Sequence, residues 1–485
     1  MPVSLHYLSA EEYGLWIVVQ SLGFYLGLSE FGLGQTVMNR MGAAFARRQM
    51  AGTAALLSNA FALYHLIAVP FWLALIACWW GNHWSRWLAK SPSAGNSTHL
   101  GLYVMLFGTL TLLKVPWTTF PAALAGLREL PLRQLYELVA SILLFLTVLV
   151  TFAFGGRVLA LVLSTGGASV MLAAAAYPLV RSRYPEARIR LTLVDPRVMR
   201  GLLADSLSFF LISLAYVMQR YSPSVLAAKY TSLDVVPQVY AVVTLLRLVG
   251  WSLADIPSRS VQPYVIMLGE QGQERQVRAL ACLATKFSFA VAVVFAALVA
   301  VHANWFLNRW LAPLRFTEYG ILAAMTAAFL LDALFLPATN VLVALNRHKR
   351  LALLLAVQGL AGAAVAVLLA EAGVLSPTAR LGVGFLIASL IVNVGWIPRL
   401  LKVELGMPMR CLARCAGFAF LLWAALGALW LASPRLVPVG GSAVCLAGTW
   451  ILGGRILLSQ GERHQLASLV RSIRPVAPTL RSTSD

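Results

Sequence analysis

The sequence predicts an all-α polytopic membrane protein with about 13 transmembrane helices in two pseudo-symmetric bundles. Hydrophobic residues make up 60% of the 485 residues and charged residues only 12%, whereas soluble domains carry about 25% charged residues. The mean hydropathy is +0.78. In addition, apolar runs of about 20 residues recur along the chain, and each is long enough to cross a hydrocarbon core of about 30 Å.

These apolar runs give the predicted helices in order, with ends defined to within a few residues. The predicted spans are residues 13–37, 54–79, 101–123, 136–155, 158–180, 205–228, 236–257, 282–302, 319–341, 351–371, 381–398, 415–433 and 436–454.

The positive charge is distributed as in a membrane protein. The net charge is +20, which in a soluble protein would suggest a nucleic-acid partner. Here most of the 38 Lys and Arg residues fall in every second loop, starting after the first span, and in the C-terminal tail. Because Lys and Arg accumulate in cytoplasmic loops, the sequence predicts a cytoplasmic C-terminus and an N-terminus outside, and no nucleic-acid partner.

Cysteine and histidine residues indicate neither a disulfide framework nor a metal site. The five cysteines are scattered at Cys78, Cys282, Cys411, Cys415 and Cys445, and the seven histidines are not clustered. A lone histidine inside a span is more often a packed helix contact than a ligand. We therefore predict no metal and no cofactor.

Two similar segments suggest an internal repeat. Residues 121–133 and 337–350 each begin with Pro-Ala, end with basic residues and precede an apolar span, six spans apart. An even separation makes the two halves parallel, a known plan for transporters. The predicted regions are an N-terminal bundle of five spans, a C-terminal bundle of six, two additional helices and a basic cytoplasmic tail, at 1–203, 204–402, 403–457 and 458–485. The unequal count leads us to expect one further helix encoded upstream of Met1.

Charged residues inside the spans are the candidate functional residues, because each costs about 2.5–3.5 kcal/mol to insert. The cations are Lys114, Arg220 and Arg247, and the carboxylates are Glu30 and Asp332. One interpretation is purely structural, with Glu30 paired to Lys114 and Asp332 to Arg247. The other is a water-filled cavity with a surplus of positive charge, in which the planar fork of Arg binds diphosphate.

Several motifs resemble bacterial polysaccharide flippases of the MOP superfamily, which export O-antigen or exopolysaccharide. The similar segments are Tyr13-Gly14-Leu15-Trp16, the Glu30-Phe-Gly-Leu-Gly run, the repeat described above, Leu246-Arg247-Leu248 and Pro263 before a polar stretch. Members of that family begin with one helix before the Tyr-Gly-Leu-Trp-like segment, and this sequence does not.

The resemblance implies a two-lobed, MATE-like transporter in the bacterial inner (cytoplasmic) membrane, and not an enzyme. It would flip a polyprenyl-diphosphate-linked oligosaccharide by alternating access. Arg220 and Arg247 would bind the diphosphate, Lys114 the same charge or a sugar acid, and Glu30 and Asp332 would serve gating or ion coupling. The expected partners are this lipid-linked substrate, membrane lipids, and a polysaccharide polymerase with glycosyltransferases.

Two other classes remain open. A multidrug or cation antiporter of the same superfamily would need an acidic pocket, which the surplus of cations disfavours. A non-transporting membrane enzyme or scaffold in glycan assembly is also open. The predicted outer loops are too short for a folded catalytic domain, but the intramembrane charges could simply hold helices together.

Overall fold

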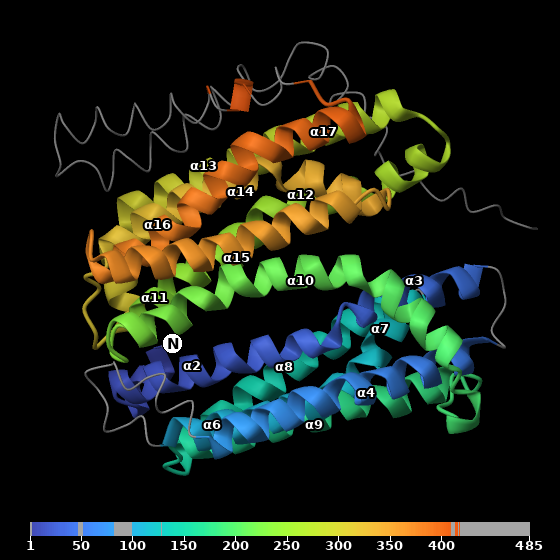
Figure 1. Ribbon diagram of the computed structural model, residues 1–485, viewed down its shortest axis with the longest axis horizontal. Coiled ribbons are helices and arrows are strands. Elements are labelled where there is room, and N and C mark those ends of the chain that lie inside the picture. Colours follow the sequence, from blue (N-terminus) through green and yellow to red (C-terminus); the bar gives the residue numbers. More distant parts are fainter. Residues whose placement is uncertain are drawn as a thin grey trace, which may run out of the picture. The chain divides into compact units, whose positions relative to one another are not determined.

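The computed structural model of the chain describes residues 2–46, 52–81, 99–127, 129–408, 413–415 and 417. Throughout these residues every regular element is a helix (Figure 1). Ten helices are long and apolar enough to cross a membrane, and the bent pair Ala10–Glu30 and Leu33–Phe45 makes an eleventh span if it is counted as one. The predicted all-α membrane architecture is therefore confirmed.

The first eleven predicted spans each correspond to one of these helices or to the bent pair. Several helices are longer than predicted, for example Val236–Glu270 for the expected 236–257. Hydropathy detects only the apolar part of a helix, whereas backbone hydrogen bonding continues into the polar region. The predicted spans 415–433 and 436–454, and the tail 458–485, lie almost wholly outside the described residues, so the number of 13 spans is not confirmed.

By its internal contacts the described chain divides into two compact units. The first, unit 1, contains residues 1–249, 304–331 and 346–397. The second, unit 2, contains residues 250–303, 332–345 and 398–485. Two long helices, α13 (Glu274–Leu311) and α14 (Tyr319–Ala344), contribute residues to both units.

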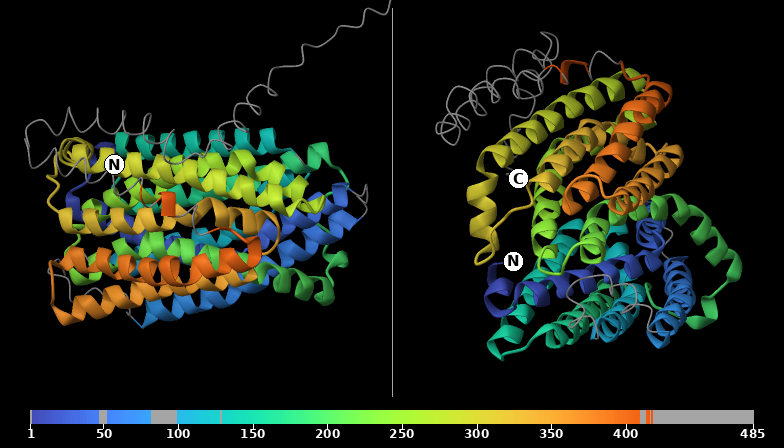
Figure 2. Two further views of the ribbon diagram at one scale, coloured as in Figure 1. Left: turned by 90° about the horizontal axis from the view of Figure 1, so that it is seen from above. Right: turned by 60° about the vertical axis from the view of Figure 1, so that its left-hand side comes forward.

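The N-terminal part of unit 1 is a bundle in which α2, α4, α6, α8 and α9 run side by side (Figure 1, Figure 2). Its helices are α1 (Pro2–Tyr7), α2 (Ala10–Gly27), η1 (Leu28–Glu30), α3 (Leu33–Ala46), α4 (Thr53–Trp80), α6 (Leu100–Lys114), η4 (Val115–Thr118), α7 (Thr119–Gly126), α8 (Leu130–Ala153) and α9 (Val158–Arg183). A core of fully buried side chains, including Leu33, Tyr64 and Phe120, joins α3, α4, α7 and α9.

The helix α8 illustrates why this bundle belongs in a membrane. Leu135, Leu138, Leu143 and Phe145 are all exposed, although α8 is among the most apolar helices of the chain. A row of exposed apolar side chains of this length would be unfavourable in water. It is the surface expected to face lipid.

The remaining helices of unit 1 include α10 and three helices that pack against it, α11, α15 and α16. They are η5 (Leu191–Leu193), α10 (Pro196–Tyr230), α11 (Val236–Val243), the π-helix η6 (Thr244–Gly250), α15 (Lys349–Ala372), α16 (Pro377–Leu390) and the π-helix η7 (Ile391–Trp396). The helix α10 contacts α2 and α3 on one side and α15 on another. At one such contact, Arg40 of α3 forms an ion pair with Asp205 of α10 at 2.7 Å.

Unit 2 is formed by α12 (Trp251–Glu270), parts of α13 and α14, and α17 (Ile397–Leu405). Its helices are joined by polar contacts as well as by apolar packing. The guanidinium Nε of Arg278 on α13 donates to the carbonyl oxygen of Leu405 in α17 at 3.0 Å. Two prolines, Pro257 and Pro263, lie inside α12.

Candidate functional site

The predicted carboxylate Glu30 lies at a break in a membrane-spanning helix. The chain forms α2, one turn of 3₁₀-helix and then α3, with a bend of 40° between the two parts. Phe31 and Gly32, directly after Glu30, both have left-handed backbone conformations, with φ of 51° and 68°. A helix cannot continue through two such residues. The sequence predicted one continuous span over 13–37 and missed this break, which glycine makes possible.

The predicted cation Lys114 also lies at a helix break. It is the last residue of α6, and Pro116 follows in the 3₁₀-helix η4 before the chain resumes as α7. Proline removes one backbone donor and so frees a carbonyl group. Just after this proline, the hydroxyls of Thr118 and Thr119 donate to the carbonyl oxygens of Val115 and Pro116 at 2.7 and 2.8 Å.

The two breaks contact each other, since η1 packs against η4. This packing places the helix breaks of Glu30 and Lys114 next to each other. The Glu30–Lys114 ion pair of the structural interpretation remains a prediction. Both side chains are only partly buried. The carboxylate of Glu30 also lies next to the backbone N–H of Gly34. The positive charge of Arg133 acts on the same carboxylate.

Gly34 leaves the space that the Glu30 carboxylate occupies, so a larger residue there would displace this flexible side chain. A Cβ atom added to Gly34 would lie 2.3 Å from Oε1 of Glu30, far inside van der Waals contact. The carboxylate therefore occupies the space that any larger residue at position 34 would fill. The sequence analysis did not identify Gly34, because Glu30 and Gly34 lie on opposite sides of the break and come together only through the left-handed turn at Phe31 and Gly32.

A buried tyrosine completes this cluster, which we call the break cluster (Glu30, Gly34, Tyr64, Lys114 and Thr118). Tyr64 of α4 is 0% exposed. Its hydroxyl faces both Glu30 and Thr118, yet it forms no hydrogen bond of regular geometry with the described residues. Sequence reasoning missed Tyr64, because a tyrosine in an apolar helix is usually a core residue.

The predicted cation Arg220 lies elsewhere, in the second half of α10. Its guanidinium donates to the hydroxyl of Tyr216 at 2.8 Å and lies 5.8 and 5.5 Å from the ring centroids of Tyr216 and Tyr221. The Tyr221 ring stacks in turn on Phe24 of α2 at 4.1 Å. The aromatic neighbours expected for Arg220 are therefore present, and Arg220 is itself partly exposed.

The structure does not test the second predicted pair. Arg247 is 4% exposed and lies in the π-helix η6 of unit 1, whereas Asp332 is 7% exposed and belongs to unit 2. The Arg247–Asp332 pair therefore remains a prediction. Short π-helical segments are frequent at functional sites, which keeps Arg247 among the candidates.

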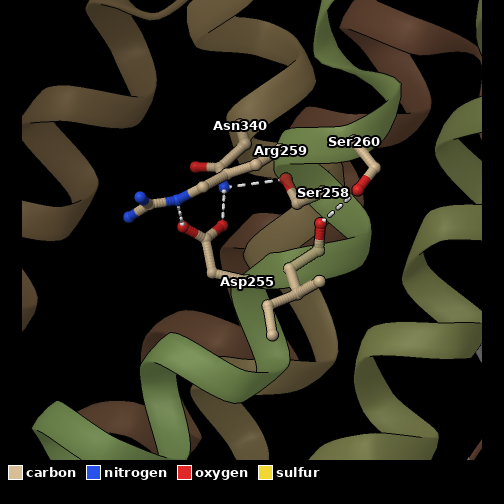
Figure 3. A network of polar contacts seen from close by, with 6 residues as sticks. Asp255, Ser258, Arg259, Ser260 and Asn340 are labelled. Carbon is tan, nitrogen blue, oxygen red and sulfur yellow. Dashed lines mark hydrogen bonds and ion pairs between the residues drawn. The ribbon is translucent and has the colours of Figure 1, made fainter. Parts of the chain in front are cut away.

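One buried carboxylate of unit 2 was overlooked. Asp255 of α12 is 6% exposed, and its two oxygens accept from Arg259 at 2.5 Å and from the side-chain amide of Asn340 at 2.7 Å (Figure 3). The same amide donates to Ser258 at 2.9 Å. Asp255 lies inside the predicted span 236–257, with Arg259 four residues later, and this helical spacing is the signal that could have identified it.

Metal ligation finds no support in the part of the chain that the structure describes. No group of three His, Cys, Asp or Glu side chains converges there. The break cluster contains one carboxylate, one ammonium group and hydroxyls, which can bind an anion or exchange hydrogen bonds.

Solved structures with a similar fold are membrane transporters. The lipid II flippase MurJ in an inward closed conformation has a TM-score of 0.63 and 12% sequence identity, covering 91% of this chain and 92% of that one. An inward-facing multidrug resistance MATE family transporter of the MOP superfamily also gives 0.63 and 12%, covering 81% and 94%. A MOP superfamily transporter from Pyrococcus furiosus, described by the reverse polarity of its binding pocket, gives 0.56 and 14%, covering 83% and 93%.

No protein-family model and no curated protein sequence matches this chain. At 12 to 14% identity the similarity to the solved structures shows a common fold. The expected MATE-like architecture is thus confirmed, while a shared substrate is a separate matter, because one fold can host different functions.

Proposed function

We propose that this chain, which has the fold of the MOP superfamily transporters, flips a polyprenyl-diphosphate-linked oligosaccharide across the bacterial inner membrane. The observation that supports this proposal most directly is the setting of Arg220. A partly exposed guanidinium offers bidentate hydrogen bonds to a diphosphate, and the exposed ring of the neighbouring Tyr216 offers an apolar face to a sugar.

The balance of charge within the spans agrees with an anionic substrate. Among the five predicted site residues, three are cations and two are carboxylates. A diphosphate sugar cannot enter hydrocarbon without replacing its hydration shell, and cationic side chains supply that replacement. Arg220, Arg247 and Lys114 would bind the head group, while Glu30 and Asp332 would serve gating or ion coupling.

The mechanism is alternating access without covalent chemistry. The polyprenyl chain would stay in lipid while the lobes rock around the bound head group. The C-terminal tail would face the cytoplasm, because Lys and Arg accumulate in the loops on the same side. A polysaccharide polymerase and glycosyltransferases are the partners that would consume and supply the substrate.

Export of the glycan in cells tests this function. In a strain that lacks the chromosomal gene, Arg220→Glu should reduce surface glycan more than Arg220→Gln, because reversal repels the diphosphate whereas neutralisation only removes an attraction. A loss of about tenfold or more is expected for Arg220→Glu, corresponding to one charge-assisted hydrogen bond. Arg157→Gln is the matched control, since that side chain is 77% exposed in a surface ion pair.

Membrane levels of each variant decide whether a loss is functional. Arg247→Ala should abolish export at a normal protein level, and Arg247→Lys should retain part of it, because an ammonium group attracts diphosphate without forming the bidentate fork. If Arg247→Ala instead removes the protein from the membrane, Arg247 has a structural role. Equal export by Arg220→Glu and Arg220→Gln would contradict an anionic ligand at Arg220.

A multidrug antiporter is the second candidate, because a MATE family transporter has the same fold. The reverse polarity described for the Pyrococcus furiosus transporter supports the idea that binding-site charge varies within this fold. Resistance to cationic drugs conferred by the expressed chain, together with unchanged glycan export in the deletion strain, would favour this alternative.

A further inference from the structure

The short loop of residues 184–195 connects two membrane-spanning helices, α9 and α10, and lies in a strongly basic part of the chain. Between Arg181 and Arg200 the sequence contains six arginines and only two carboxylates. All six arginines are exposed. Because the loop directly joins two spans, it lies at a face of the membrane, and the distribution of Lys and Arg predicts that this face is cytoplasmic.

Two buried polar residues of α4 hold the backbone of this loop in place. The hydroxyl of Ser58 accepts from the backbone N–H of Arg190 at 2.8 Å. The side-chain amide of Asn59 donates to the carbonyl oxygen of Leu193 at 2.8 Å, and its oxygen accepts from the backbone N–H of Asp195 at 2.7 Å. Ser58 and Asn59 are 1% and 0% exposed. The loop therefore follows a defined path across the end of α4.

This path places basic and apolar side chains on opposite faces of the loop. The backbone of Arg190 is extended, with φ of −136° and ψ of 115°, and successive side chains of an extended chain point to opposite sides. Ala187 is fully buried in the core of the N-terminal bundle, and Ile189 packs against that core. Arg188 and Arg190 accordingly lie on the outer face, where both are exposed.

The charge of this outer face is not neutralised by the part of the chain that the structure describes. Arg183, at the end of α9, forms an ion pair with Glu129 at 3.2 Å. Neither Arg188 nor Arg190 has an ion pair or a guanidinium hydrogen bond with any described residue. Two guanidinium groups, each with a planar set of donors, are therefore available to an external anion.

An exposed apolar residue follows directly after these arginines. Leu191 is 77% exposed. A single exposed leucine is ordinary on a protein surface in water, but this one lies beside two arginines at the membrane face. There a leucine can enter the boundary between head groups and acyl chains, while neighbouring arginines reach lipid phosphates. A purely ionic contact with an acidic protein would make no use of the leucine.

We propose that Arg188, Arg190 and Leu191, which we call the loop surface, bind an anionic phospholipid of the adjacent leaflet. The two guanidinium groups hold the lipid phosphate through paired hydrogen bonds, and Leu191 contacts the acyl chains. A lipid with a net negative charge is preferred over a zwitterionic one, whose choline group the arginines repel. The loop surface shares no residue with the candidate transport site, so this proposal is independent of the transported substrate.

Native mass spectrometry of the purified full-length chain, with phosphatidylglycerol or phosphatidylcholine added in detergent, measures this binding. Wild type should prefer phosphatidylglycerol. The double variant Arg188→Gln with Arg190→Gln should bind it about tenfold or more weakly, because two charges at the membrane face are lost. Its binding of phosphatidylcholine should change much less.

A matched control removes the same number of charges elsewhere. Arg157→Gln with Arg380→Gln lowers the net charge equally, but these arginines already have partners, Arg157 in an ion pair with Glu12 and Arg380 in a hydrogen bond to the carbonyl oxygen of Leu375. This control should bind phosphatidylglycerol as wild type does. An equal loss in both double variants would refute a specific surface, as would equal binding of the two lipids by wild type.

Leu191→Ser tests the apolar part of the surface, with Thr192→Ser as the control in the next position, which is also exposed. Leu191→Ser should weaken phosphatidylglycerol binding several-fold and Thr192→Ser should not. Equal binding by the two variants would overturn the assignment to lipid and favour an acidic protein.

Thermal unfolding gives a second readout of the same site. Without added lipid, the double variant of Arg188 and Arg190 should melt as wild type does, since both side chains are exposed. Phosphatidylglycerol should raise the melting temperature of wild type more than that of the variant, because a ligand of the folded state stabilises it. The same rise in both would contradict lipid binding at this loop.

Discussion

The contact of the α2–α3 break with α10 predicts a large and specific effect of adding one methyl group. Gly32 has φ of 68°, and a Cβ atom there would lie 2.6 Å from the backbone N of Phe210 and 2.7 Å from Cβ of Phe209. The left-handed conformation costs alanine about 1–2 kcal/mol. Overpacking against a neighbouring backbone adds about 1–3 kcal/mol. Gly32→Ala should therefore destabilise the folded chain by about 2–5 kcal/mol.

Gly27→Ala is the matched control, five residues earlier in the same broken span. Gly27 has φ of −60°, and a Cβ atom there would meet nothing within 4 Å. This substitution should be neutral or stabilise the protein by up to about 1 kcal/mol, because alanine restricts the unfolded chain. Thermal unfolding of both variants in the same detergent, followed by size-exclusion chromatography, measures the difference.

A further variant tests the cause of the effect. The closest atoms to the added methyl group are the backbone N of Phe210 and the Cβ and backbone C of Phe209, so truncation of the Phe210 ring cannot relieve the clash. Gly32→Ala should consequently remain destabilising in a Phe210→Ala background. The reasoning is refuted if Gly32→Ala is as stable as Gly27→Ala, or if truncation of Phe210 rescues it fully.

Three further predictions concern other helices. Asp255→Ala should cost about 1–3 kcal/mol in thermal stability, because it leaves a part-buried amide on α14 without its carboxylate acceptor; an unchanged melting temperature would contradict this. The Arg40–Asp205 pair is 34% and 57% exposed, so a double-mutant cycle should give a coupling of about 0.2–1 kcal/mol, and a value above about 2 kcal/mol would be inconsistent with a solvated pair. A cysteine at Pro377 should react with an impermeant thiol reagent in intact cells and one at Gln273 only after permeabilisation, and the reverse pattern would overturn the predicted orientation.

The sequence by itself determined the structural class and most of the helix order. Hydropathy is a local property, and the thickness of the bilayer sets the length of each apolar run, so the eleven spans predicted up to residue 398 could be placed without any tertiary contact. The cost of inserting charge also identified Glu30, Lys114 and Arg220 as unusual residues. The tyrosines beside Arg220 could be predicted because they are its neighbours along one helix.

Only the tertiary structure decided what surrounds these charges. Glu30 and Lys114 were one of two suggested pairs, and no local signal placed both at helix breaks that pack together. Tyr64 and Gly34 carry no signal of their own in the sequence, because a tyrosine or a glycine in an apolar helix usually only packs. Their roles follow from contacts between segments far apart in the chain, and such contacts depend on how helices pack rather than on how apolar each one is.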